Sequence, residues 1–112
     1  MKFYHNPRCG KSRKALQLLQ ERNAEIQVIE YLKEIPTKVD IKVILKKLGL
    51  DALQLVRKNE TIYKEQYKGK ELGEDEWIDA MIKHPKLIER PILVHNDNAV
   101  IGRPPENVLT LL

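Results

Sequence analysis

The stretch Tyr4-His5-Asn6-Pro7-Arg8-Cys9-Gly10-Lys11-Ser12-Arg13 joins a short apolar strand to a helical pattern and contains the only cysteine of the chain. Apolar residues at Ala15, Leu18 and Leu19 follow at helical spacing, so Cys9 is predicted at or just before a helix N-terminus. The first N–H groups of a helix have no partner within it and carry partial positive charge. A thiol placed there ionises more readily, and an oxyanion finds hydrogen-bond donors. The stretch therefore predicts an activated thiolate beside an anion site.

A single cysteine is more often a small buried hydrophobe than a nucleophile. Around Cys9, however, Pro7 and Gly10 are poor residues for a core strand, and His5 adds positive charge when protonated. Four permanent cations also lie close by in the sequence, namely Arg8, Lys11, Arg13 and Lys14. This composition favours a reactive thiol over a core residue.

Length and composition limit the number of domains and the kinds of partner that we expect for this protein. We expect residues 1–112 to form one domain, because typical domains contain about 100–150 residues. The net charge of +4 is spread over interleaved acidic and basic residues, which argues against a nucleic-acid-binding protein. One cysteine permits no internal disulfide and no cysteine-rich metal site, so we expect no metal and a reducing, cytoplasmic location. No signal-peptide pattern is present and no apolar run approaches the ~18 residues of a membrane span, so no membrane association is expected.

The first part of the chain predicts a βαβ unit. Residues 2–4 form a strand, a helix extends to about Arg22, and residues 26–31 form a second strand. Short joints between such elements predict a parallel, right-handed connection.

The middle of the chain, about residues 37–88, reads as a helical insertion. Thr37 is a suitable N-cap and Gly49 a suitable stop for a helix whose apolar face is Ile41, Ile44, Leu45 and Leu48. A short turn at 52–56 follows, and then an exposed connection at 61–73 with room for one helical turn. A helix at 74–83 comes next, and Pro85 ends it.

The last part predicts an antiparallel hairpin and a closing helix. Residues 92–94 and 99–101 are β-type runs separated by an Asn/Asp-rich turn. Prolines 104 and 105 suit the first turn of a helix with a buried side formed by Val108, Leu109, Leu111 and Leu112. The predicted fold class is therefore α/β, with a thioredoxin-like order (β-α-β, then β-β-α) and a helical insertion between the halves.

At several separate places the sequence resembles the glutathione- and glutaredoxin-dependent arsenate reductases of bacteria, within the broader ArsC/Spx family. The resemblance rests on Tyr4-His5-Asn6-Pro7-x-Cys9-Gly10-x-Ser12-Arg13, Tyr31-Leu32, Leu55-Val56-Arg57-Lys58-Asn59, His84-Pro85-x-Leu87-Ile88-x-Arg90-Pro91-Ile92 and Ile101-x-Arg103-Pro104. Arg8 and Lys11 depart from the small residues expected there.

The resemblance implies a complete site. Cys9 is the nucleophile, and the oxyanion is bound by Arg57, Arg90 and Arg103. His5 favours the thiolate, and Pro91 matches a cis-proline beside the active cysteine. The other matched residues of the opening motif are Asn6, Gly10, Ser12 and Arg13. The implied substrate is arsenate, the co-substrate is glutathione and the protein partner is glutaredoxin. No tightly bound cofactor is implied, and we expect a monomer.

Other functions remain open. A related thiol-dependent reductase of another substrate would keep the fold and the cysteine. An Spx-like regulator that binds RNA polymerase usually carries a C-x-x-C switch, but Ser12 stands at its second position. A nucleotide-binding P-loop needs glycine where His5 stands, and a phosphatase-type thiol site needs arginine where Ala15 stands.

Overall fold

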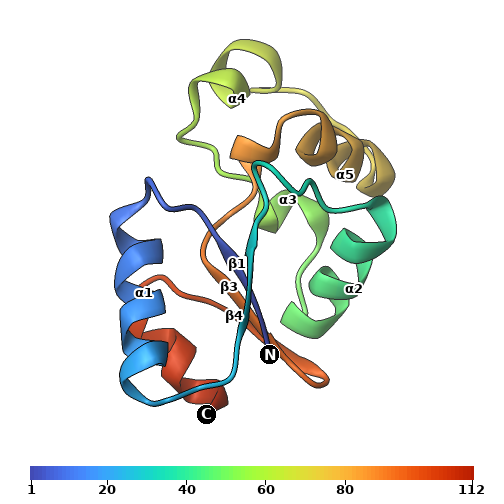
Figure 1. Cartoon of the computed structure of the whole chain (residues 1–112). Coiled ribbons are helices and arrows are strands. Elements are labelled where there is room, and N and C mark those ends of the chain that lie inside the picture. The colour runs from blue at the N-terminus through green and yellow to red at the C-terminus, as the bar shows by residue number, and fades with distance from the viewer. The chain divides into compact units, whose positions relative to one another are not determined.

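The computed structural model describes residues 1–112 and divides into two compact units (Figure 1). The first, here called the sheet unit, contains residues Met1–Glu34 and Arg90–Leu112. The second, here called the helical unit, contains residues Ile35–Glu89, within which the predicted insertion falls. That the whole chain behaves as one domain stays a prediction. None of the helices has both the length and the apolar character that a membrane span requires.

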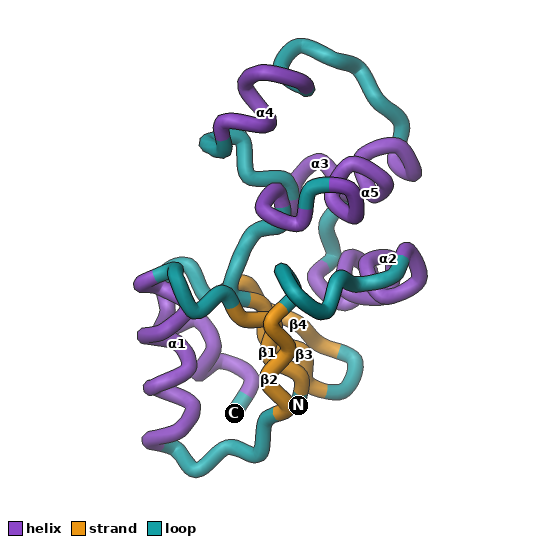
Figure 2. The backbone as a smooth tube through the Cα atoms, turned by 45° about the horizontal axis from the view of Figure 1, so that its top comes forward, coloured by secondary structure: helices purple, strands orange, loops and turns teal.

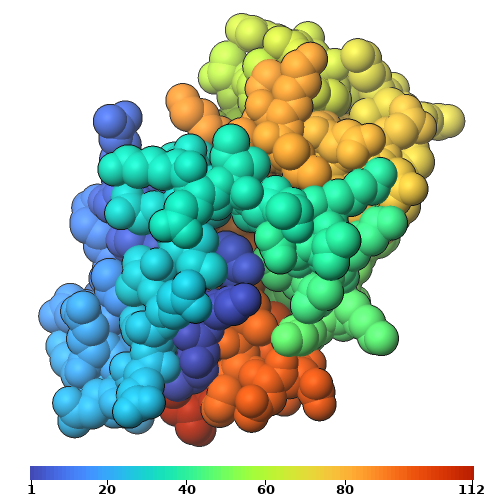
Figure 3. All heavy atoms as spheres, turned by 45° about the vertical axis from the view of Figure 1, so that its right-hand side comes forward, coloured from blue at the N-terminus to red at the C-terminus, as the bar shows by residue number.

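The sheet unit is built on four strands in the order β2-β1-β3-β4. They are β1 (Lys2–His5), β2 (Gln27–Glu30), β3 (Ile92–His95) and β4 (Asn98–Ile101). Strands β1 and β2 are parallel, with Phe3 opposite Val28, whereas β1–β3 and β3–β4 are antiparallel. In Figure 3 the dark-blue N-terminal residues lie between the light-blue segment that includes β2 and the orange hairpin. The predicted α/β class and the β-α-β, β-β-α order are confirmed.

Two helices share one core with this sheet. Helix α1 (Gly10–Glu21) and the 3₁₀ helix η2 (Pro105–Leu111) contact each other and lie side by side in Figures 1 and 2. Their buried residues close on the sheet in a cluster of Phe3, Ala15, Leu19, Leu93 and Val108, each fully buried. This core fixes the start of α1, and hence Cys9, against the end of β1.

The closing helix differs from its prediction. It is a 3₁₀ helix, and of the four residues predicted to be buried only Val108 is fully so. Leu109 and Leu111 pack partly against the core, and the terminal Leu112 is 49% exposed. A 3₁₀ helix has three residues per turn, so apolar residues spaced for an α-helix do not all face one side.

The helical unit contains α2 (Lys38–Leu48), α3 (Ala52–Leu55), α4 (Thr61–Gln66), α5 (Glu74–Lys83) and the 3₁₀ turn η1 (Pro85–Leu87). The predicted start and stop of α2 are confirmed. The Thr37 hydroxyl accepts from the Asp40 N–H at 3.1 Å, and the Asp40 carboxylate accepts from the Thr37 N–H at 2.9 Å. Gly49 ends the helix in the left-handed region, with φ 70°.

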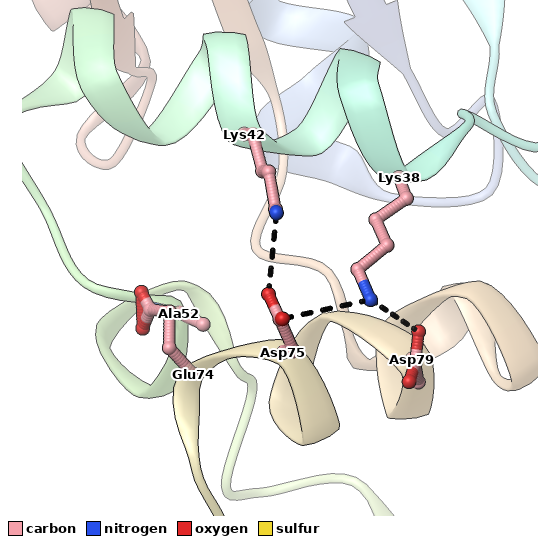
Figure 4. A network of polar contacts seen from close by, with 6 residues as sticks. All are labelled: Lys38, Lys42, Ala52, Glu74, Asp75 and Asp79. Carbon is pink, nitrogen blue, oxygen red and sulfur yellow. Dashed lines mark hydrogen bonds and ion pairs between the residues drawn. The ribbon is translucent and has the colours of Figure 1, made fainter.

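Polar contacts join α5 to α2 and α3 (Figure 4). Lys38 lies between Asp75 and Asp79 at 3.8 and 3.6 Å, and Lys42 pairs with Asp75 at 3.3 Å. These exposed pairs contribute little individually. The Glu74 carboxylate accepts from the Ala52 N–H at 2.7 and 3.0 Å, and so caps the N-terminus of α3 from the start of α5.

Candidate active site

Cys9 is the N-cap residue of α1, as its position in the sequence predicted. The loop before Cys9 is held by Asn6, which is buried and forms three hydrogen bonds with its carbonyl, its side-chain oxygen and its N–H. The Asn6 carbonyl accepts from the Cys9 N–H at 3.0 Å, and its side-chain oxygen accepts from the Arg8 N–H at 3.0 Å. The Asn6 N–H donates to the Ser12 hydroxyl at 3.1 Å. The backbone of Cys9 is therefore fixed by its own loop and by the first turn of α1.

The Cys9 thiol is half-buried, and its surroundings favour the thiolate. Burial raises the pKa of Cys9, but hydrogen bonds from the Ser12 N–H, the Arg90 side chain and the Lys11 N–H outweigh it. The charge of Arg90 acts in the same direction, so the net pKa of Cys9 is lowered. These N–H groups belong to the first turn of α1, where the helix leaves donors unpaired.

His5 supports this loop as a neutral group. Its Nδ1 lies 2.7 Å from the Ser12 Oγ, and both side chains are buried. Burial lowers the pKa of His5, Glu30 raises it in part, and Arg13 lowers it further. The net pKa is lowered, so the imidazole is neutral near pH 7 and adds no positive charge at Cys9. His5 acts here through its contact with Ser12.

Arg13 and Gly10 complete the opening motif. The Arg13 guanidinium is exposed and donates to the Pro7 carbonyl at 3.0 Å, which ties α1 back to the loop before Cys9. A Cβ at Gly10 would lie 3.7 Å from the Arg13 Nη2, an ordinary contact, and Gly10 has no positive φ. The local structure therefore places no steric demand for glycine at this position.

The sheet unit brings one of the three predicted arginines, Arg90, to Cys9 and places a second, Arg103, against the Arg90 backbone. The Arg90 side chain bonds the thiol, and Arg103 Nη1 donates to the Arg90 carbonyl at 3.4 Å. The Arg90–Pro91 peptide bond is cis, as the resemblance implied for Pro91, and Arg103–Pro104 is also cis. Gly102 packs against Pro91, and its N–H donates to the Pro91 carbonyl at 2.8 Å.

Arg57, the third predicted arginine, belongs to the helical unit. Its guanidinium lies between two carboxylates, with Nε 3.6 Å from Glu60 and Nη1 3.5 Å from Glu89. That Arg57 binds the same anion as Arg90 and Arg103 stays a prediction.

Glu60, Glu89 and Gly102 were not identified from the sequence. Glu60 is only three positions from Arg57 in the chain, whereas Glu89 becomes its neighbour through a bridge between residues 56 and 88, which lie far apart in the sequence. Periodicity and local motifs carry no signal for such a contact. No group of three or more His, Cys, Asp or Glu side chains is placed to hold a metal ion.

A half-buried thiol with a lowered pKa, fixed donors and an arginine is suited to nucleophilic attack on an oxyanion. An arginine can bind an oxyanion through two parallel hydrogen bonds, which a lysine cannot do. The residues of the sheet unit thus combine a nucleophile with donors for negative charge.

Comparison with known proteins shows the family of this chain. Uncharacterized protein YfgD of Escherichia coli (strain K12) is 46% identical over an alignment that covers 100% of this chain and 96% of YfgD. An arsenate reductase of Neisseria meningitidis serogroup B is 42% identical, with 100% and 97% covered. The solved structure of an arsenate reductase from Vibrio cholerae has a TM-score of 0.94 and 45% identity, with 100% and 98% covered. The model of the ArsC family matches residues 4–111, and this chain therefore belongs to the ArsC family.

Proposed function

We propose that this protein is an arsenate reductase that forms a covalent intermediate at Cys9. The observation that carries the proposal is the position of Cys9 at the N-cap of α1, where its thiol is hydrogen-bonded by the first turn of α1 and by Arg90. Arsenate is a multiply charged oxyanion, so it needs both a thiolate to attack arsenic and cationic donors to bind its oxygens. The family membership and the arsenate reductases among the similar proteins support the same substrate.

The proposed reaction begins when the Cys9 thiolate attacks arsenic and an oxygen leaves as water, which gives a thiol–arsenate ester. Reduction of arsenate to arsenite requires two electrons, and two thiols supply them as they become a disulfide. In balanced form, one H₂AsO₄⁻, one proton and two thiols give one As(OH)₃, one water and one disulfide. Arg90 and Arg103 bind the negative oxygens during these steps, and Arg57 is proposed as the third ligand.

The electron donors are proposed to be glutathione and then glutaredoxin, which resolves the mixed disulfide. The chain has one cysteine and cannot form a disulfide within itself, so an external thiol must complete the cycle. Reduced thiols are plentiful in the cytoplasm, where we propose that the protein acts as a monomer.

The deciding experiment measures arsenite formed from arsenate in the presence of glutathione, glutaredoxin, glutathione reductase and NADPH. We expect Cys9→Ser to abolish arsenite formation. Arg90→Ala should lower kcat/KM for arsenate by roughly 10²–10³-fold, as expected for the loss of a charged donor to a reacting oxyanion. Arg22→Ala is the matched control, because Arg22 is an exposed arginine at the other end of α1.

Absence of arsenite from the folded wild-type protein, with Cys9 reduced, would overturn the proposal. A thiol-dependent reductase of another substrate would then be the next function to test. Equal loss in Arg22→Ala and Arg90→Ala would contradict a specific oxyanion site at Cys9.

A further inference from the structure

Arg57 is held by charge on two sides. Its Nε lies 3.6 Å from the Glu60 Oε1, and its Nη1 lies 3.5 Å from the Glu89 Oε1. The three side chains are only 16%, 24% and 23% exposed, respectively, so solvent screens these pairs less than it screens the lysine pairs on α2. The Nε contact with Glu60 is an ion pair without a hydrogen bond.

The backbone fixes all three residues in one local frame. Val56 and Ile88 form an antiparallel bridge. Beside it the Arg57 N–H donates to the Leu87 carbonyl at 2.7 Å, and the Glu89 N–H donates to the Leu55 carbonyl at 2.9 Å. The Glu60 N–H donates to the Arg57 carbonyl at 3.4 Å, so Glu60 is turned back toward the same residue. Backbone hydrogen bonds therefore hold both glutamates close to Arg57.

We propose that Glu60 and Glu89 are positioning residues, which hold the Arg57 guanidinium in place for an oxyanion. This inference rests on the proposed function, in which Arg57 is a ligand of arsenate. Glu89, which contacts Arg57, directly precedes Arg90 in the chain. The same short segment therefore carries a contact of one proposed arsenate ligand and the whole of another.

Two effects of the carboxylates oppose each other. Their negative charge repels an incoming anion, which weakens binding. Their contacts, however, remove rotamer freedom from a long side chain before the anion arrives, which strengthens binding. Because the backbones are fixed and the side chains partly buried, we infer that preorganisation outweighs repulsion. The sign of the effect on affinity therefore tests the inference.

The test measures the Kd of arsenate by calorimetry in the Cys9→Ser protein, where no covalent ester with the thiol forms. Glu89→Gln and Glu60→Gln each remove one charge and keep the side-chain shape. We expect each to raise the Kd by roughly three- to tenfold, the size of one charge-assisted contact. Glu65→Gln, an exposed glutamate on α4, is the matched control and should leave the Kd unchanged.

A double-mutant comparison distinguishes an effect on affinity that passes through Arg57 from a general structural effect of the glutamate substitution. In an Arg57→Gln background, Glu89→Gln should cause no further loss of affinity, because its effect passes through Arg57. An unchanged or lower Kd in both single variants, a full additional loss in the Arg57→Gln background, or no measurable arsenate binding would each overturn the inference. If Glu89→Gln does not fold, Glu60→Gln decides.

The two proposals fail in different ways. Arsenite formation by the wild type with no effect of Glu60→Gln or Glu89→Gln on the Kd would leave the reductase and remove the positioning role. Arsenate binding weakened by both variants, without any arsenite formed by the wild type, would leave the positioning role and remove the reductase.

Discussion

The thiol of Cys9 experiences two opposing influences, and the balance between them sets its reactivity. Burial disfavours the charged thiolate, whereas the α1 N–H groups and Arg90 favour it. The position of Cys9 at a helix start was predictable, because strand, cysteine and helical periodicity follow one another in the sequence. The contact with Arg90 was not derivable from spacing, since 81 residues separate the two, and only the family resemblance placed them together.

At the residue scale, the first prediction concerns the pKa of Cys9. In the folded protein, the pH midpoint of its alkylation by iodoacetamide should lie below that of the same chain unfolded in urea. Arg90→Gln should move the folded midpoint upward, because both a hydrogen bond and a positive charge are lost. Arg22→Gln serves as control and should leave it in place. A midpoint that is the same in folded and unfolded protein would contradict the proposed activation.

The second prediction concerns His5 and the pH dependence of stability. Its pKa is lowered in the folded state, so between the folded and unfolded pKa values the unfolded chain binds more protons. The contribution of His5 to stability is therefore fully present above its unfolded pKa, near 6.5, and is lost as pH falls toward the folded pKa.

His5→Gln should reduce the loss of unfolding free energy that accompanies a fall in pH. The measurement is the free energy of unfolding from urea titrations at pH 7.5 and at pH 5, compared between wild type and variant. His95→Gln is a second histidine change in the same unit and controls for the loss of any imidazole. An equally steep decline in wild type and His5→Gln would exclude His5 as its source.

At the element scale, local signals were sufficient for most helices and strands. The capping box of α2 and the Asn/Asp turn between β3 and β4 each lie within a few neighbouring residues, so both were predicted. The 3₁₀ form of η2 was not predicted, because the sequence signals for a helix do not distinguish three from 3.6 residues per turn. The close packing of Gly102 was missed for a related reason, since its neighbours Pro91 and Val108 come from other elements.

The junction between β4 and η2 gives the third prediction. A Cβ at Gly102 would lie 2.7 Å from the Pro91 Cγ and 3.0 Å from the Val108 Cγ1, too close without a shift in the core. Gly102→Ala should therefore lower the free energy of unfolding by about 1–3 kcal/mol, as overpacking does elsewhere. Gly10→Ala, with only an ordinary contact at 3.7 Å, should change it by less than about 1 kcal/mol. Equal stabilities of the two variants in urea titrations would contradict the packing argument.

For the whole molecule, the order of the elements along the chain was predicted, because the two halves have distinct local patterns. The antiparallel pairing of β1 with β3, which joins the halves in one sheet, was not predicted from any local pattern. The sequence also separated the sheet-forming ends from the helical middle, which correspond to the sheet unit and the helical unit. What no local pattern provides is the set of contacts between distant residues, such as Arg57 with Glu89 and Arg103 with Arg90. The chemistry that we propose for the site depends on these contacts.

The last prediction follows from the cysteine count of the whole chain. Arsenate reduction consumes two thiols, and the chain supplies one, so arsenate mixed with reduced protein in the absence of any other thiol should yield no arsenite. Cys9 should instead lose its reactivity toward iodoacetamide while arsenate is present and regain it when arsenate is removed, because the ester hydrolyses without net oxidation. Added glutathione should then start arsenite formation in the wild type and leave Cys9→Ser inactive. Release of arsenite without added thiol, at half the protein concentration and with a disulfide-linked dimer on a non-reducing gel, would show instead that a second copy of the chain provides the missing thiol.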